Sequence, residues 1–176
     1  MKSFWLCFAA GSVLIIWFSW TVSIRAGRFH GIARFFAFEG ILALFLLNVR
    51  GWFHDPGSVL HAASWILLAG SLALAAASIS LYFRCAAPQG QFENSTHLVE
   101  TGIYRYIRHP MYGSLMLLGL GIYLKRVTTL TSVLAFVVVL ALVLTALIEE
   151  GEMRARFGEI YAAYKRKTKR FIPFLF

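Results

Sequence analysis

The chain has 176 residues, of which 59% are hydrophobic, with a mean hydropathy of +0.70 and a formal net charge of +9. This composition excludes an ordinary soluble domain and is typical of a membrane protein with several spans. The length leaves no room for a separate soluble catalytic domain. Residues 1–176 are therefore expected to form one membrane domain whose chemistry lies at the ends of its spans.

The basic residues lie beside apolar runs, which favours membrane orientation and contact with anionic membrane lipid over nucleic-acid binding. No nucleic-acid motif accompanies them, so no nucleic-acid partner is expected. The two cysteines, Cys7 and Cys85, have neither zinc-ligand nor disulfide spacing, and we predict free thiols and no metal site.

Three apolar runs in residues 1–83 are each long enough to cross a bilayer, for which about 20 helical residues suffice. They cover Phe4–Ile24, Ile32–Val49 and Val59–Phe83. From just before the third run and along it, small residues recur at intervals of seven, which predicts a face that another helix can approach closely. These residues are Gly57, Ser64, Ser71 and Ser78.

Three polar residues near these runs, Glu39, His54 and His61, have structural interpretations. Glu39 lies inside the second run, where an ionisable group must face protein or water. We interpret it as a carboxylate near the interface that pairs with Arg34 or with a neighbouring helix, and a functional site residue is the alternative. His54 and His61 flank the next turn and are interpreted as hydrogen-bonding surface groups rather than ligands.

A helical hairpin is predicted in the C-terminal half. Pro110 follows a long polar loop and suits the first turn of a helix. A short apolar segment, Met111–Leu124, is followed almost immediately by a longer one, Val127–Ile148. The two segments are therefore expected to pack antiparallel, with Lys125 and Arg126 at their turn snorkelling to the far surface.

The hairpin has a consequence for two polar clusters. His109 precedes its descending arm, and Glu149 and Glu150 follow its ascending arm. Both clusters are therefore expected to lie close together on one side of the membrane.

The tail, Glu149–Phe176, is predicted to be a basic amphipathic helix lying on anionic lipid. Glu150 with Arg154, and Glu152 with Arg156, have the i,i+4 spacing that favours ion pairs on a helix. The last residues, 171–176, are expected to dip into the bilayer. The fold predicted for the whole chain is an all-α, polytopic membrane helix bundle of about five transmembrane helices with a C-terminal interfacial helix.

The distribution of positive charge predicts the orientation. With five spans, 13 of the 17 Lys and Arg residues lie on the side that carries the polar clusters. The positive-inside rule places that side in the cytoplasm, and an integral protein of the cell inner membrane is expected.

Residues around the start of the hairpin point to a ligand. Tyr104, Arg108 and Tyr112 are spaced by four, and so are Arg105 and His109. Arginine can bind a carboxylate or phosphate with two hydrogen bonds, and aromatic faces can bind a cation. These residues suit a ligand with carboxylate, amine and cationic parts, and anchoring at the membrane interface is the alternative.

Three segments together carry a family resemblance: LVETGIYRYIRHPMYG at 98–113, Glu149-Glu150, and FGEIYAAY at 157–164. This combination resembles the isoprenylcysteine carboxyl methyltransferase family, whose wider relatives include membrane phospholipid N-methyltransferases and bacterial thiol methyltransferases. The resemblance covers about 89–173. It implies an integral membrane enzyme that uses S-adenosylmethionine, with residues 84–176 forming a cofactor-binding loop, the hairpin and a cytosolic tail.

By position, the resemblance implies cofactor contacts and candidate catalytic residues. The catalytic candidates are Arg108, His109 and Glu149. The cofactor contacts would be Gln89, Thr96, His97, Leu98, Val99, Tyr104, His109, Pro110, Met111, Tyr112 and Glu149.

The chain departs from that family at Thr145, where the eukaryotic prenylcysteine enzymes have an arginine thought to hold the substrate carboxylate. The acceptor is therefore left open as a carboxylate, amine or thiol on a lipophilic or small molecule. A carboxylate needs no base, whereas for an amine or thiol Glu149, Glu150, His109 or a tyrosine could remove the proton.

Two other functions are considered. One is a non-catalytic membrane protein that binds anionic lipid or a partner through its basic tail. The other is a membrane reductase using NADPH, which ranks last because the sequence has no Gly-rich phosphate-binding motif. The oligomeric state is left open.

Overall fold

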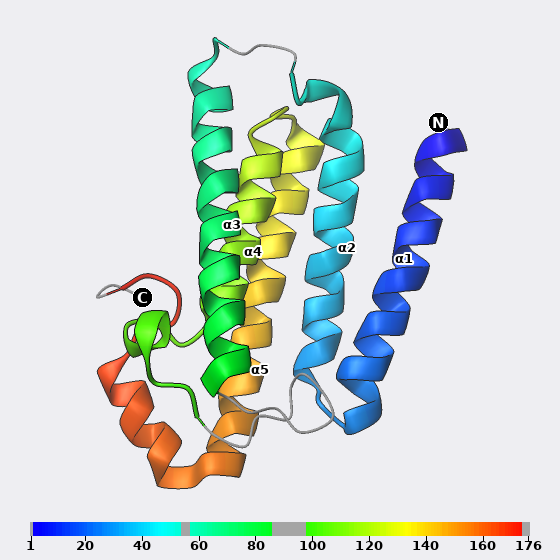
Figure 1. Cartoon of the computed structure of the whole chain (residues 1–176). Coiled ribbons are helices and arrows are strands. Elements are labelled where there is room, and N and C mark those ends of the chain that lie inside the picture. The colour runs from blue at the N-terminus through cyan, green and yellow to red at the C-terminus, as the bar shows by residue number, and fades with distance from the viewer. Residues whose placement is uncertain (1, 54–56, 86–97, 174–176) are drawn as a thin grey trace.

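The computed structural model describes residues 2–53, 57–85 and 98–173. In these residues the regular structure is helical, as predicted. The helices are α1 (Lys2–Val22), α2 (His30–Asn48), α3 (Val59–Cys85), α4 (Pro110–Tyr123) and α5 (Thr129–Lys167), with short 3₁₀ turns η1 (Ile24–Ala26), η2 (Val49–Gly51) and η3 (Gly102–Arg105). They run side by side as a bundle, with α1 at one edge and α3 at the other (Figure 1).

Four of the helices are long and apolar enough to cross a membrane, namely α1, α2, α3 and α5. The fifth apolar helix, α4, has 14 residues and is shorter than a usual span. It packs antiparallel to the first part of α5, so the predicted hairpin is present (Figure 1). The chain is therefore an integral membrane helix bundle.

The helix α5 extends beyond the last predicted span, which ends at Ile148, and continues through Glu149 and Glu150 without a break. The helix direction changes instead at Gly158, whose φ of 55° and ψ of −128° are not helical. Only glycine adopts such a conformation without strain, since it has no Cβ. Beyond Gly158 the chain turns away from the bundle axis (Figure 1).

Two serines of the predicted small-residue face, Ser64 and Ser71 on α3, pack against α4. Gly57 of that predicted face lies before α3, with open space around it. The Ser64 hydroxyl donates to the Gly121 carbonyl at 2.6 Å, and the Ser71 hydroxyl donates to the Ser114 carbonyl at 2.7 Å. A Cβ added to Gly121 would lie 2.9 Å from Leu68 Cγ, so the glycine permits this close approach. In an apolar layer these hydrogen bonds satisfy hydroxyls that lipid could not.

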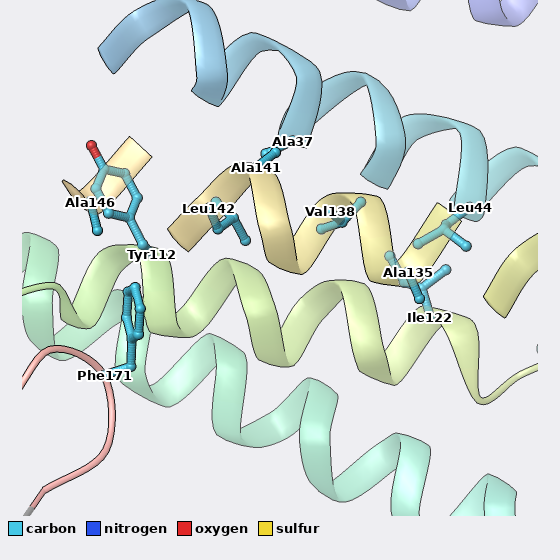
Figure 2. Close-up of a cluster of buried hydrophobic side chains, with 10 residues drawn as sticks. All are labelled: Ala37, Leu44, Tyr112, Ile122, Ala135, Val138, Ala141, Leu142, Ala146 and Phe171. Carbon is cyan, nitrogen blue, oxygen red and sulfur yellow. The ribbon is translucent and has the colours of Figure 1, made fainter. Parts of the chain in front are cut away.

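The buried core joins α2, α4 and α5. Figure 2 shows Ala37 and Leu44 of α2 facing a row of small and branched residues on α5, with Ile122 of α4 beside them. Val138 of α5 lies where Gly40 and Gly119 leave room, since a Cβ at either glycine would come within 3.2 Å of it. This packing fixes the hairpin against α2.

The first helix is attached to the bundle through α2. The Ser12 hydroxyl of α1 donates to Glu39 Oε2 at 2.7 Å, which confirms that Glu39 pairs with a neighbouring helix. Arg34 donates instead to the Ser23 hydroxyl, at 2.5 Å.

Two sequence-based interpretations of the loop residues need correction. His61 is buried rather than at the surface, with Nε2 2.8 Å from the Gly51 carbonyl oxygen, and His54 lies outside the described residues. Lys125 does not snorkel, because its ammonium lies 3.7 Å from the centre of the Trp65 ring and the side chain is buried. The aromatic face offers the cation an attraction inside the protein.

Candidate active site

The segment that precedes α4 is joined to the tail by backbone hydrogen bonds. Lys169 donates from its amide to the Tyr106 carbonyl at 3.0 Å, and its own carbonyl accepts from the Arg108 amide at 2.8 Å. The His109 amide donates to the Arg170 carbonyl at 3.1 Å. These bonds frame a short parallel β-bridge between Ile107 and Lys169 and hold the segment 106–109 against the tail, after which Pro110 begins α4.

Phe171 packs against this segment, so the expectation that residues 171–176 dip into the bilayer is wrong at its first residue. The Phe171 ring is buried, with its centre 6.1 Å from that of His109, and it lies beside Tyr112 in Figure 2. Residues 174–176 lie outside the described part of the chain.

Glu150 is surrounded by positively charged side chains. Its Oε1 accepts from the Arg108 Nη2 and the Arg170 Nε, both at 3.0 Å, and its Oε2 lies 2.7 Å from Lys165 Nζ. Glu150 is 3% exposed, and a buried carboxylate is tolerated only when its charge is compensated in this way. It therefore joins the middle of α5 to Arg108 before α4 and to Arg170 after α5, rather than forming the predicted pair with Arg154.

Arg108 also makes several hydrogen bonds within the protein. Beyond Glu150, its Nη1 donates to the Thr168 carbonyl and to the Lys165 carbonyl, the latter at 3.3 Å. The guanidinium thus holds the C-terminal end of α5 against the start of α4. This arrangement is that of a residue that positions the site.

His109 lies between the two adjacent glutamates. Its Nε2 is 3.5 Å from Glu150 Oε1 and its Nδ1 is 3.8 Å from Glu149 Oε2. The ring stacks on Tyr112 with centres 5.6 Å apart and an angle of 17° between the planes. Neither carboxylate makes a hydrogen bond to the ring, and the buried Nε2 has no hydrogen-bond partner among the described residues. The ring nevertheless lies between the two carboxylates, so the two clusters predicted to meet at one end of the hairpin do so.

Glu149 differs from its neighbour. Its Oε2 is buried and makes no hydrogen bond, although the side chain lines a cavity. An unpaired buried carboxylate oxygen is costly unless a ligand donor reaches it. Glu149 is therefore the residue of this pair that is suited to accept a hydrogen bond from a bound molecule.

Two tyrosines connect the cavity wall to the bundle. The Tyr164 hydroxyl donates to the Tyr104 carbonyl at 2.7 Å, and the Tyr104 hydroxyl donates to the Ser78 carbonyl of α3 at 3.4 Å. Burial raises the pKa of the Tyr104 phenol, and the nearby charge of Glu149 raises it further. A raised pKa favours the protonated phenol, which makes Tyr104 less suited than Glu149 or His109 to accept a proton.

These groups line one cavity of about 300 Å³ at the polar end of the bundle. All of the predicted site residues that the structure describes contribute to its wall: Leu98, Val99, Tyr104, Arg108, His109, Pro110, Met111, Tyr112 and Glu149. The other three, Gln89, Thr96 and His97, lie outside the described residues.

The same cavity has a wall that the sequence did not predict. It comes from α1 and α2 through Phe18, Arg34 and Phe38, and from the segment between them through Arg28. Neither arginine was assigned to the site from the sequence, and no sequence spacing links them to 104–112. Nearby, His30 Nδ1 lies 2.6 Å from Glu152 Oε2, which ties the start of α2 to α5.

The family model for phospholipid methyltransferases matches residues 59–160, which is more than half of the chain. The chain belongs to the phospholipid methyltransferase family. No curated protein matches it. Members of this family are membrane methyltransferases that use S-adenosylmethionine, so the cofactor and the class of enzyme expected from the resemblance are confirmed. The match begins with α3, so α1 and α2 lie outside it.

The cavity suits that cofactor. S-adenosylmethionine carries an amine and ribose hydroxyls, which are hydrogen-bond donors for the unpaired oxygen of Glu149. It also carries a sulfonium cation, which the aromatic rings of Tyr104 and Tyr112 in the wall can attract.

Proposed function

We propose that the protein transfers the methyl group of S-adenosylmethionine to a lipophilic acceptor, at the cytosolic face of the cell inner membrane. The observation that carries this proposal is the cavity at the end of the hairpin, where an unpaired carboxylate oxygen of Glu149 lies beside His109. The family supports methyl transfer, and the excess of Lys and Arg on this side supports the cytosolic orientation.

The cofactor would be held by the residues between η3 and α4 together with Glu149. Its sulfonium supplies the methyl group. Tyr104 and Tyr112 would orient the cation, and Glu149 would accept from the amine or from ribose. Arg108 would act through Glu150 and Thr168, as a positioning residue that keeps the segment before α4 in place.

The protein's part in the chemistry is mainly to align the acceptor atom with the methyl group and to exclude water. If the acceptor is a carboxylate, no proton has to move. If it is an amine or thiol, its proton would pass to Glu149 Oε2 or to a nitrogen of His109, which lie 3.8 Å apart at the closest pair. Glu150 is less suited to this role, because three basic side chains hold its carboxylate.

The acceptor of the prenylcysteine enzymes is not favoured. The hydroxyl of Thr145 is fully buried and donates to the Ala141 carbonyl of its own helix at 2.7 Å. It therefore offers nothing to a substrate carboxylate at that position. In the alternative of a lipid-binding tail without catalysis, Arg170 is paired with Glu150, whereas Arg166, Lys167 and Lys169 are exposed and can contact anionic lipid. That alternative does not account for the cavity around Glu149 and His109.

The test is calorimetric binding of S-adenosylmethionine to the detergent-purified protein. The proposal expects Glu149→Gln and His109→Ala to weaken binding at least tenfold, because each removes a group from the cavity wall. Glu159→Gln is the matched control, since Glu159 is exposed on the same helix. Unchanged affinity in both site variants, with well-folded samples, would show that the cofactor does not occupy this cavity.

A further inference from the structure

The cavity extends past the residues proposed to hold the cofactor. On one side it is bounded by Phe18 and Phe38 of α1 and α2, and on the other by Ala75 and Ile79 of α3. Leu115 of α4 contributes between them, and α4 packs against both α2 and α3. This part of the cavity is therefore an apolar space between α2 and α3, and the proposed cofactor contacts do not use it.

Arg34 is the charged residue of α2 in this part of the wall. It is 5% exposed, and its guanidinium carbon lies 5.5 Å from the centre of the Phe18 ring and 5.8 Å from that of Phe38. One of its nitrogens donates to the Ser23 hydroxyl, which fixes the plane of the group. A planar guanidinium held by aromatic faces is suited to bind a carboxylate or phosphate.

The depth of these residues gives the space a direction. Arg34 lies in the second turn of α2, at the end of the bundle where His30 contacts Glu152. Phe38 is one turn further along, about 6 Å deeper by the helical rise. On α3, the lining runs from Tyr82 through Ile79 to Ala75, which is about 10 Å along the axis. The wall of the space is therefore basic at the polar end of the bundle and apolar deeper inside. This order matches an amphiphile with an anionic headgroup and an apolar chain.

We propose that Arg34 binds an anionic group of the methyl acceptor, a phosphate or carboxylate, while the acceptor's apolar chain lies between α2 and α3. The inference rests on the proposed function, because it assigns the acceptor side of the same cavity. It makes Arg34 a residue that determines specificity: acceptors with an anionic headgroup bind, and neutral acceptors of equal chain length bind more weakly. Arg34 lies outside the residues that the family model matches.

The experiment measures binding of dodecyl phosphate, below its micelle concentration, to the full-length protein in a neutral detergent with S-adenosylmethionine bound. Dodecanol and inorganic phosphate are the comparison probes. We expect dodecyl phosphate to bind at least tenfold more tightly than either. Arg34→Gln is expected to remove that preference and Arg34→Lys to restore part of it. Arg25→Gln, which removes an exposed arginine of the same helix connection, is expected to leave it unchanged.

The outcomes separate the inference from the proposed function. Failure of the wild-type protein to bind S-adenosylmethionine would overturn the proposed function itself. Normal cofactor binding with equal affinity for dodecyl phosphate and dodecanol would overturn only the role of Arg34. Inorganic phosphate binding as tightly as dodecyl phosphate would overturn the apolar chain site. If Arg34→Gln weakens cofactor binding in a folded sample and Arg34→Lys restores it, Arg34 holds the cofactor carboxylate and the inference is wrong.

Discussion

Replacing Glu150 with glutamine should detach the tail from the bundle. The carboxylate has hydrogen bonds or ion pairs with Arg108, Arg170 and Lys165, and of these Arg108 is 6% exposed and Arg170 16%. Glutamine keeps one acceptor oxygen at nearly the same place, yet it removes the negative charge. Two largely buried guanidinium groups are then left without compensation.

The size of the effect follows from these contacts. Removing one partner of a buried ion pair destabilises a protein by about 3–5 kcal/mol. We take about 3 kcal/mol, because glutamine retains an acceptor, and Lys165 is half exposed so that its pair contributes little. For a chain of this length, that value corresponds to a fall in melting temperature of roughly 6–12 °C.

Two measurements check this prediction. Thermal unfolding of Glu150→Gln in detergent gives the stability, with Glu159→Gln as the control at an exposed position. Amide hydrogen exchange gives the location: the amides of Arg108 and Lys169, which bond across the tail junction, should exchange faster. Equal melting temperatures for the two variants, or unchanged exchange at these amides, would refute the view that Glu150 holds the tail.

Two glycine substitutions test the backbone. Gly158→Ala should lower the free energy of unfolding by about 1–3 kcal/mol, because Gly158 has a positive φ. Gly151→Ala is the control and should be neutral or stabilising, because Gly151 is helical and an added Cβ there meets no neighbour. Equal effects of the two substitutions in chemical unfolding would contradict the kink. Gly121→Ala should destabilise the protein by about 1–3 kcal/mol, because the added Cβ would overlap Leu68 at the α3–α4 contact. Gly70→Ala is the control, since its added Cβ would lie 3.8 Å from its nearest neighbour. Thermal unfolding compares the two variants, and equal melting temperatures would contradict the prediction.

The hairpin and the meeting of its polar ends could be predicted because they depend on apolar length alone. Once α4 and α5 are joined by a tight turn, His109 and Glu149 must lie at the same end of the hairpin. His109 Nδ1 is 3.8 Å from Glu149 Oε2. The close approach of a helix to one face of α3 was predictable because Ser64 and Ser71 recur at a helical spacing, but the spacing did not predict that this helix is α4.

Contacts between distant segments could not be predicted in this way. The spacing of Glu150 and Arg154 favours a local helical pair, but tertiary structure brings Arg108 and Arg170 closer, and buried contacts with two guanidinium groups outweigh one exposed pair. Arg34 likewise gave no signal, because its position in the cavity wall depends on how α2 packs on α5. The apolar run ends at Ile148, but this does not predict where the helix bends. The helix α5 continues past Glu149, because no residue interrupts it before Gly158.

The adjacent glutamates show how one helix serves two purposes. Consecutive residues of an α-helix point about 100° apart, so Glu149 and Glu150 cannot face the same surroundings. Glu149 faces the cavity with an unpaired oxygen, and Glu150 faces the tail with three basic partners. His109 contacts both, and so its orientation depends on the tail being in place. A substitution that loosens the tail should therefore also disturb the cofactor side of the cavity, whereas Glu149→Gln should weaken cofactor binding and leave the tail attached.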